Sequence, residues 1–304
     1  MNNYQEILDL IAQKQADEII TVLGPTATGK TRLAVRLAKD LDGEIISADS
    51  RQVYRKMDIG TGKDLSDYTI NQQTIPYHLI DIAEPGTEYN VAQYQQAAYQ
   101  AIDSIRARHK EVILCGGSGM YIESLLNGFR LSPITRDEKL YAELNAKSDE
   151  ELIQLLQSFR TLHNHTDTCE RRRLIKAVEI EYYYQQHPEW KDLTRKVPSL
   201  IIGLTGNRDF IRKKITQRLQ ERLQSGMIEE VEQLIKQGVN TEQLLRYGLE
   251  YKYLTRYISG QIDRDTMFEK LEIAIHQFSK RQMTWFRGME RRGFTIHWID
   301  IKNL

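Results

Sequence analysis

The sequence predicts an α/β fold, a parallel sheet flanked by helices, with a helical insertion domain. Three observations predict it. Short β-branched runs alternate with helical patterns in the first part of the chain, as in sheets built from strand–helix–strand units. Residues 131–197 are charged and helical in pattern, and a strand-like run returns at residues 200–204. We therefore expect a core domain of residues 1–130 and 198–304 with C-terminal helices, and a helical insertion domain of residues 131–197.

The amino-acid composition indicates the cellular compartment of the protein but not its binding partner. The 304 residues carry 42 Lys and Arg and 42 Asp and Glu, so net charge does not point to a polyanion. Cys115 and Cys169 lack the spacing of a metal site or disulfide framework, which fits a reducing cytoplasm. No apolar run resembles a signal peptide or reaches the roughly 20 residues of a membrane span. We expect a cytoplasmic monomer without a membrane partner.

Apolar periodicity places the elements of the core. The expected strands are residues 19–23, 44–48, 78–82, 112–115 and 200–204. The expected helices are residues 4–15, 33–41, 91–108 and 211–224.

The loop between the first strand and its helix satisfies every fixed position of the pattern G-x-x-x-x-G-K-[ST]. Such a P-loop turns its backbone N–H groups toward an anion, and the helix N-terminus adds positive potential. Lys30 is expected to neutralise phosphate oxygens, and the Thr31 hydroxyl to bind Mg²⁺. The alternative is a turn that binds nothing. The predicted phosphate-binding residues are Gly24, Pro25, Thr26, Ala27, Thr28, Gly29, Lys30 and Thr31. They predict a P-loop NTPase-like sheet that binds a di- or triphosphate.

Asp49 follows the second expected strand and so faces the same edge of the sheet as Lys30. Its position alone leaves a helix cap, an Mg²⁺ ligand and a general base open. A second glycine-rich junction, residues 116–119, follows another strand and predicts a close backbone approach to a ligand.

Several ordered blocks together carry a family resemblance. They are GPTATGKT, DSRQVY, MDIGTGK, YHLIDI, GGSGMY and KRQMTWFR, spread from about residue 19 to residue 287. In this order they resemble the tRNA dimethylallyltransferase family. The resemblance implies transfer of a dimethylallyl group from dimethylallyl diphosphate to the exocyclic N6 of an adenine next to the anticodon in tRNA. It implies Mg²⁺ as cofactor, and dimethylallyl diphosphate and the tRNA anticodon loop as partners, while the P-loop holds the donor's diphosphate and no ATP is consumed.

The resemblance also assigns residues. Asp49 is the implied general base, Thr26 the implied hydrogen-bond donor to the bridging oxygen, and Arg218 an arginine that reaches the pyrophosphate. Together these three are the implied catalytic residues. The implied tRNA-binding residues are Asp49, Ser50, Arg51, Gln52, Ser118, Arg172, Arg173, Leu174, Ile175, Lys176, Lys280, Arg281, Gln282, Trp285 and Arg287.

Some positions depart from the family pattern. Arg172 stands in place of a glutamine, Lys176 replaces an arginine, and Ser118 replaces a threonine. An arginine frequent in the family aligns with Leu140, or with Lys139 after a one-residue slip, and Glu250 stands where most members have glycine. From the residues alone, the charge run around Arg172 also fits a solvated helix face. The resemblance instead favours tRNA phosphate contacts there.

Three other functions remain alternatives. An adenylate isopentenyltransferase would use free AMP, ADP or ATP as acceptor, and a P-loop small-molecule kinase would use ATP as donor. The third alternative function is that of a non-catalytic phosphate-binding regulator. Such a protein would not need Asp49, Thr26 and Arg218 together. The long insertion and the basic C-terminal block favour tRNA over a free nucleotide.

Overall fold

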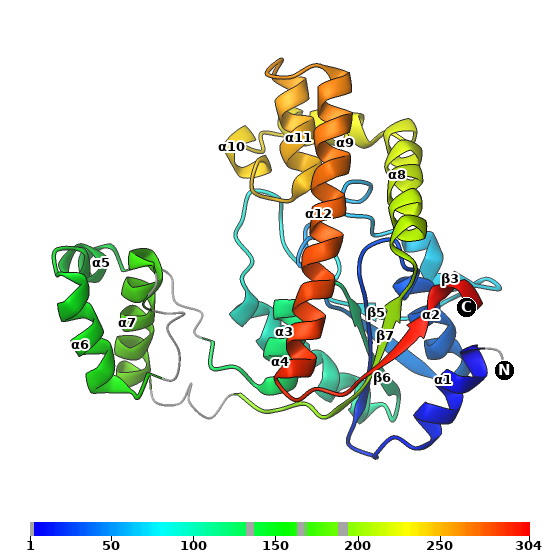
Figure 1. Cartoon of the computed structure of the whole chain (residues 1–304), viewed down its shortest axis with the longest axis horizontal. Coiled ribbons are helices and arrows are strands. Elements are labelled where there is room, and N and C mark those ends of the chain that lie inside the picture. Colours follow the sequence, from blue (N-terminus) through cyan, green and yellow to red (C-terminus); the bar gives the residue numbers. More distant parts are fainter. Residues whose placement is uncertain (1–2, 132–136, 163–167, 169, 188–193) are drawn as a thin grey trace. The chain divides into compact units, whose positions relative to one another are not determined.

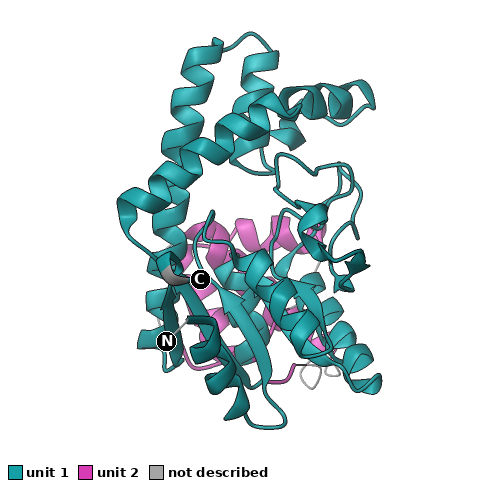
Figure 2. Cartoon of the chain, turned by 90° about the vertical axis from the view of Figure 1, so that its right-hand side faces the viewer, with its two compact units in different colours: residues 1–127, 197–304 teal, residues 128–196 magenta. Residues whose placement is uncertain are grey.

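The computed structural model describes residues 3–131, 137–162, 168, 170–187 and 194–304. The chain forms two compact units, which Figure 2 colours separately. The first unit contains residues 1–127 and 197–304, and the second contains residues 128–196. The second unit thus begins three residues before the expected insertion, at 128 instead of 131, and ends one residue earlier, at 196 instead of 197.

A six-stranded sheet is the centre of the first unit (Figure 1). All its neighbouring strands pair in parallel. In spatial order the strands are β5 (Tyr77–His78), β2 (Gly43–Ser47), β6 (Glu111–Gly116), β1 (Ile19–Leu23), β7 (Ser199–Thr205) and β8 (Ile296–Asp300). Every residue of β1 is buried, which is why this strand reads as a continuous β-branched run.

Helices complete the first unit. They are α1 (Asn3–Ala12), α2 (Lys30–Asp40), α3 (Val91–Ala107), α4 (Gly119–Asn127), α8 (Arg208–Gln224), α9 (Met227–Lys236), α10 (Thr241–Leu244), α11 (Leu249–Ile258) and α12 (Arg264–Arg291). A short 3₁₀ helix, η1 (Leu65–Tyr68), and a small hairpin, β3 (Thr69–Ile70) with β4 (Gln73–Thr74), precede β5, and η3 (Ile301–Asn303) follows β8.

Two apolar clusters cover the two faces of the sheet. Ile20 and Val22 of β1 belong to one cluster, whereas Ile19 and Leu23 belong to the other, as the alternation of side chains along a strand requires. The helix α2 packs in the first cluster through residues such as Leu37, and α3 and α4 pack in the second. The sheet is therefore buried on both sides, as parallel sheets are.

The second unit has its own small core. It is built from α5 (Glu138–Asn145), α6 (Asp149–Phe159) and α7 (Arg171–Gln186). The helices α5 and α6 both pack on α7, around buried leucines such as Leu144, Leu152 and Leu156. Ser148 and Glu151 form a reciprocal capping box at the start of α6. The regular secondary structure among the described residues of the insertion is all helical, as the sequence predicts.

Most expected elements of the core are confirmed, and one is wrong. The strand β1 has the predicted limits, and the other elements begin or end within a few residues of theirs. The expected strand 78–82 is confined to Tyr77–His78, because Leu79 and Asp81 have φ values of 63° and 57°, which end an extended strand. The edge strand β8 was not expected, whereas α12, 28 residues long, is one of the expected C-terminal helices. None of the helices in the described part of the chain is both long and apolar enough to cross a membrane.

Candidate active site

The P-loop has the backbone conformation that its glycines permit. Gly29 has φ 82° and caps α2 without a side-chain bond, so the first N–H groups of the helix remain open to an anion. Gly24 has φ 155°, and a Cβ there would lie 2.7 Å from the Leu204 carbonyl oxygen of β7. The hydroxyl of Thr28 donates to the Pro25 carbonyl at 2.8 Å, which closes the loop on itself.

Lys30 lies on the loop itself. Its Nζ donates to the Pro25 carbonyl at 2.7 Å. The pKa of Lys30 is lowered to about 8, chiefly by burial and also by nearby Arg218, while Cys115 and Asp49 act in the opposite direction. A diphosphate oxygen would be a charged and therefore stronger acceptor for this amine than the carbonyl.

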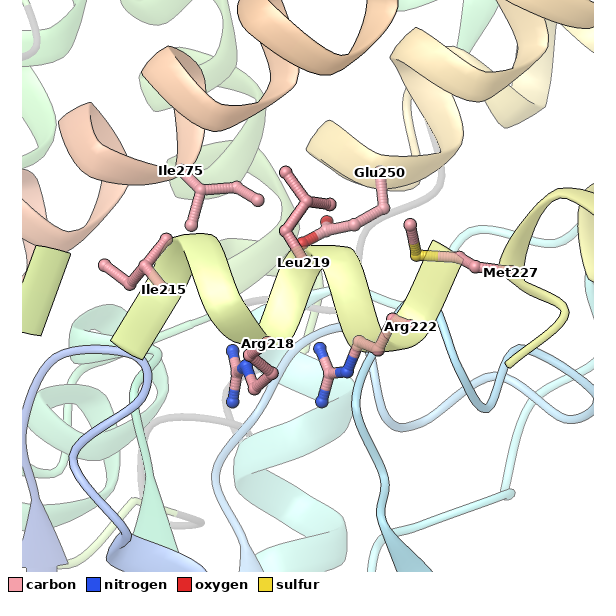
Figure 3. Close-up of a pocket in the computed structure, with 7 residues that line it drawn as sticks. All are labelled: Ile215, Arg218, Leu219, Arg222, Met227, Glu250 and Ile275. Carbon is pink, nitrogen blue, oxygen red and sulfur yellow. The ribbon is translucent and has the colours of Figure 1, made fainter. Parts of the chain in front are cut away.

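Arg218 brings a second cation to the loop. It extends from α8, and its guanidinium donates to the hydroxyl of Thr26. Burial lowers the pKa of Arg218 to about 10, and Arg222, one turn further along α8, adds to the effect. Both side chains leave the same side of α8 (Figure 3). Arg222 is held by Asp64 at 2.9 Å. Two guanidinium groups thus lie close together beside the P-loop, which favours an anion there.

Asp49 adds a carboxylate to this group. It follows β2, and its Oδ1 accepts the backbone N–H of Arg51 at 2.9 Å. Its charge interacts with both Lys30 and Arg218. The structure therefore brings together the three residues predicted to be catalytic: Thr26 follows β1, Asp49 follows β2, and Arg218 reaches them from the middle of α8.

The segment after Asp49 is held firmly. The backbone N–H of Ser50 donates to the Ser118 hydroxyl at 2.9 Å, which ties this segment to the start of α4. Gln52 accepts the Ser47 hydroxyl at 3.0 Å and donates to the Gly62 carbonyl at 3.1 Å. Ser118 and Gln52, predicted as tRNA-binding residues, thus also fix the position of the Asp49 segment.

The second glycine-rich junction is close to protein atoms. A Cβ at Gly116 would lie 2.2 Å from the Ala48 carbonyl oxygen, one at Gly117 2.4 Å from Gln282, and one at Gly119 2.3 Å from the Trp285 ring. The sequence predicts a close approach to a ligand at this junction. The structure shows that these glycines also make room for Ala48 and for Gln282 and Trp285 of α12, and the close approach to a ligand stays a prediction.

The metal prediction rests on few groups. The described residues contain no cluster of three or more His, Cys, Asp or Glu side chains suited to an ion. Thr31 is the second residue of α2, so its hydroxyl lies beside the loop. The Asp49 carboxylate is near enough to Lys30 for their charges to interact. Two hard oxygen donors beside a diphosphate fit Mg²⁺, which keeps several waters and takes much of its coordination from substrate phosphates.

On α12 the predicted tRNA-binding residues differ in exposure. Lys280, Arg281 and Arg287 are exposed, Trp285 is half-buried against Gly119, and Gln282 is only 7% exposed. Three cations of the KRQMTWFR block are thus available to a polyanion, whereas Gln282 faces the protein.

On α7 the predicted residues also divide. Arg172 and Arg173 are exposed, and Arg173 lies 3.3 Å from Glu170. Lys176 lies 3.5 Å from Glu179. The remaining two, Leu174 and Ile175, are each 1% exposed in the core of the second unit, so their side chains are not available to tRNA. That the α7 cations form one surface with Lys280 and Arg281 stays a prediction.

The positions that depart from the family pattern have clear surroundings. Glu250 lies in the first turn of α11, where the backbone is helical, and the unusual φ of 138° belongs to Gly248 before it. Burial raises the pKa of Glu250, and its carboxyl lines the same small hollow as Arg218 and Arg222 (Figure 3). Leu140 packs against the core of the second unit.

Other residues of the site could not be found from the sequence. The carboxylate of Glu230 in α9 accepts the N–H groups of Asp58, Ile59 and Gly60 at 2.8, 2.7 and 3.0 Å. Lys63 is fully buried and pairs with Asp58 and Asp81. The MDIGTGK loop is thus fixed by a helix about 170 residues later in the chain, a distance at which no local sequence pattern indicates a contact.

Comparisons with known proteins agree with this site. Residues 52–289 match the family model of IPP transferase. A tRNA dimethylallyltransferase 2 of Phocaeicola vulgatus is 56% identical over 284 residues, which are 93% of this chain and 92% of the relative. A tRNA dimethylallyltransferase 1 of Parabacteroides distasonis is 53% identical over 283 residues, 93% of this chain and 92% of that protein.

Solved structures give the same result. The full-length tRNA isopentenylpyrophosphate transferase of Bacillus halodurans matches with a TM-score of 0.67 and 31% identity, covering 94% of this chain and 90% of that one. A eukaryotic dimethylallyltransferase acting on tRNA has a TM-score of 0.76 at 23% identity, covering 94% and 74%, and supports the fold alone. The chain belongs to the IPP transferase family.

Proposed function

We propose that this chain transfers a dimethylallyl group from dimethylallyl diphosphate to the N6 amine of an adenine next to the anticodon in tRNA. The observation that carries the proposal is the joint placement of Thr26, Arg218 and Asp49 at the P-loop. Family membership supports this reaction over phosphoryl transfer, because relatives with more than half of their residues identical are named tRNA dimethylallyltransferases.

The cations at the P-loop suit the departure of a diphosphate. As the bond between the allylic carbon and the bridging oxygen breaks, both electrons stay with the diphosphate. Lys30, Arg218 and the open N–H groups at the start of α2 lie where they would stabilise that growing charge. The Thr26 hydroxyl accepts from Arg218, so its own proton is directed away from the guanidinium and is available to the bridging oxygen.

Asp49 suits the acceptor side. The lone pair of N6 forms the new carbon–nitrogen bond, and the nitrogen then loses a proton. A neutral aromatic amine is too weak an acid for a carboxylate to deprotonate beforehand, but it becomes acidic as the bond forms. Asp49 would accept that proton, since one carboxylate oxygen is bonded to Arg51 and the other is not engaged among the described residues. The target base must leave its stack to reach this site, which costs a few kcal/mol.

The proposal also includes the metal ion, the tRNA contacts, the compartment and the oligomeric state. The Thr31 hydroxyl would hold Mg²⁺, which would supply charge neutralisation to the diphosphate. The exposed cations of α7 and α12 would contact tRNA phosphates. We propose that the chain acts in the cytoplasm as a monomer and uses its P-loop for the donor without consuming ATP.

Acceptor specificity tests the proposal directly. The purified chain is incubated with radiolabelled dimethylallyl diphosphate, Mg²⁺ and, in separate reactions, unmodified tRNA, AMP or ATP. We expect label in tRNA only. Label in AMP or ATP would indicate an adenylate isopentenyltransferase. Consumption of ATP in the absence of dimethylallyl diphosphate would indicate a kinase. Lys30→Ala is the matched inactive control, because it removes a charged contact with the leaving group.

A further inference from the structure

Gln282 links three parts of the chain that meet at the active site. Its Oε1 accepts the backbone N–H of Thr26 in the P-loop at 2.8 Å. Its Nε2 donates to the Gly117 carbonyl between β6 and α4 at 2.9 Å. The side chain belongs to α12 and is 7% exposed. One amide thus bonds the donor loop, the second glycine-rich junction and the C-terminal helix together.

The bond to Thr26 distinguishes this P-loop from one in which every N–H group faces the anion. The Thr26 N–H is already satisfied by a neutral side-chain carbonyl, so it is not available to a diphosphate. The same residue receives the Arg218 guanidinium at its hydroxyl. Thr26 is therefore held from both sides, by Gln282 at its backbone and by Arg218 at its side chain, before any donor binds.

The chain leaves little freedom for another residue at position 282. The nearest atom to a Cβ at Gly117 would be Gln282 Nε2, at 2.4 Å, so the glycine makes room for this amide. Near neutral pH, where a glutamate is ionised and only accepts, the glutamine amide is the side chain of this length that offers an acceptor and a donor side by side. Arg281 and Lys280 beside it point outward and are exposed, so the neighbours of Gln282 in the same turn have a different role.

We infer that Gln282 is a positioning residue that fixes the Thr26 hydroxyl at the bridging oxygen of the donor. The inference rests on the proposed function and deepens it, because it moves Gln282 from the predicted tRNA surface to the donor site. Loss of the bond allows Thr26 to shift, and a displacement of about 1 Å can cost about 10²-fold in rate. Donor affinity depends on Lys30 and Arg218 and should change little, so the effect should appear in kcat and not in KM.

The test compares Gln282→Met with Gln277→Met, a matched change at an exposed glutamine of the same helix. Single-turnover transfer to pre-bound tRNA should fall about 10–100-fold in Gln282→Met, with the donor KM within about threefold of the native value. Gln277→Met should behave as the native chain. Amide hydrogen exchange at Thr26 should become faster in Gln282→Met alone.

A double-mutant cycle with Thr26→Ala separates positioning from a general loss of structure. If Gln282 acts through Thr26, then Thr26→Ala should cost much less rate in the Gln282→Met chain than in the native chain. Gln282→Glu keeps the acceptor for Thr26 and serves if the methionine variant fails to fold. It should recover rate as the pH falls, because the protonated acid can again donate to Gly117.

The outcomes are separable. A native chain that transfers no label from dimethylallyl diphosphate refutes the proposed function, while the Thr26 exchange rate still tests the Gln282 bond. A native chain that transfers label, with Gln282→Met equally fast or with additive effects in the cycle, overturns the inference. Unchanged Thr26 exchange in Gln282→Met overturns it as well.

Discussion

Asp49→Asn is the substitution that most sharply tests the proposed chemistry. Asparagine keeps the size of the side chain and an oxygen that can accept the Arg51 N–H, now bonded to Oδ1 at 2.9 Å. It removes the one property that the mechanism requires, the ability to take a proton. We expect single-turnover transfer to fall by about 10²–10⁴-fold, the usual contribution of a general base.

The magnitude separates chemistry from structure. A rate loss of 10²–10⁴-fold corresponds to about 3–5 kcal/mol in the activation free energy. The retained bond to Arg51 means that the free energy of unfolding should change by less than about 1 kcal/mol. Removal of a negative charge beside Lys30 and Arg218 also reduces repulsion of the donor, so donor affinity should not fall.

A second variant makes the comparison decisive. Asp49→Ala leaves the part-buried Arg51 N–H without its acceptor, which costs about 0.5–1.5 kcal/mol of stability. If Asp49 is the base, Asn and Ala should be equally slow, although only Ala is destabilised. If Asp49 only supports the loop, Asn should be fast and Ala slow.

The assay is a single-turnover measurement with pre-bound tRNA and labelled donor, repeated over a series of Mg²⁺ concentrations. Thermal or urea unfolding of each variant is measured in parallel. Rescue of Asp49→Asn by excess Mg²⁺, together with weaker donor binding, would reassign Asp49 as a metal ligand. A rate in Asp49→Asn equal to that of the native chain would refute the general-base reasoning.

Three further predictions concern the surroundings of the site. Because burial lowers the pKa of Lys30 to about 8 and a diphosphate binds the protonated amine, donor affinity should fall above that pH as binding takes up a proton. Calorimetric titration with the donor in the absence of tRNA measures this affinity as a function of pH. Lys30→Arg should remove the pH dependence, because arginine stays protonated. An affinity of the native chain that does not change up to about pH 9 would contradict the prediction. Glu230→Ala, which leaves three backbone N–H groups without their carboxylate, should lower the free energy of unfolding by about 2–4 kcal/mol in urea, whereas exposed Glu229→Ala should change it by less than about 0.5 kcal/mol. Equal stability of the two variants would show that the loop does not need Glu230. Neutralising Lys280 or Arg281 should lower the salt slope of tRNA binding by about one unit and leave donor binding unchanged, and an unaltered slope would make them ordinary solvated cations.

The sequence by itself determined the local parts of this protein. The run Ile19–Leu23, the glycine loop and the helix after it form a continuous stretch, so their pattern predicts strand, P-loop and helix without tertiary information. The same holds for the charged helical stretch that became the second unit. The expected strand 78–82 failed because apolar composition does not reveal positive φ values at Leu79 and Asp81.

Only the tertiary structure decided which distant residues share the site. Gln282 lies 256 positions after Thr26, and Arg218 lies 192 positions after it, yet both bond to that one residue. The glycines at 117 and 119 look like ligand-binding positions in the sequence, but folding places Gln282 and Trp285 against them. Hydrogen bonds of this kind depend on where the helices pack, and the apolar faces of the whole core determine that packing. The sequence next to Gln282 or Arg218 therefore contains no pattern that indicates which distant residue it will bond.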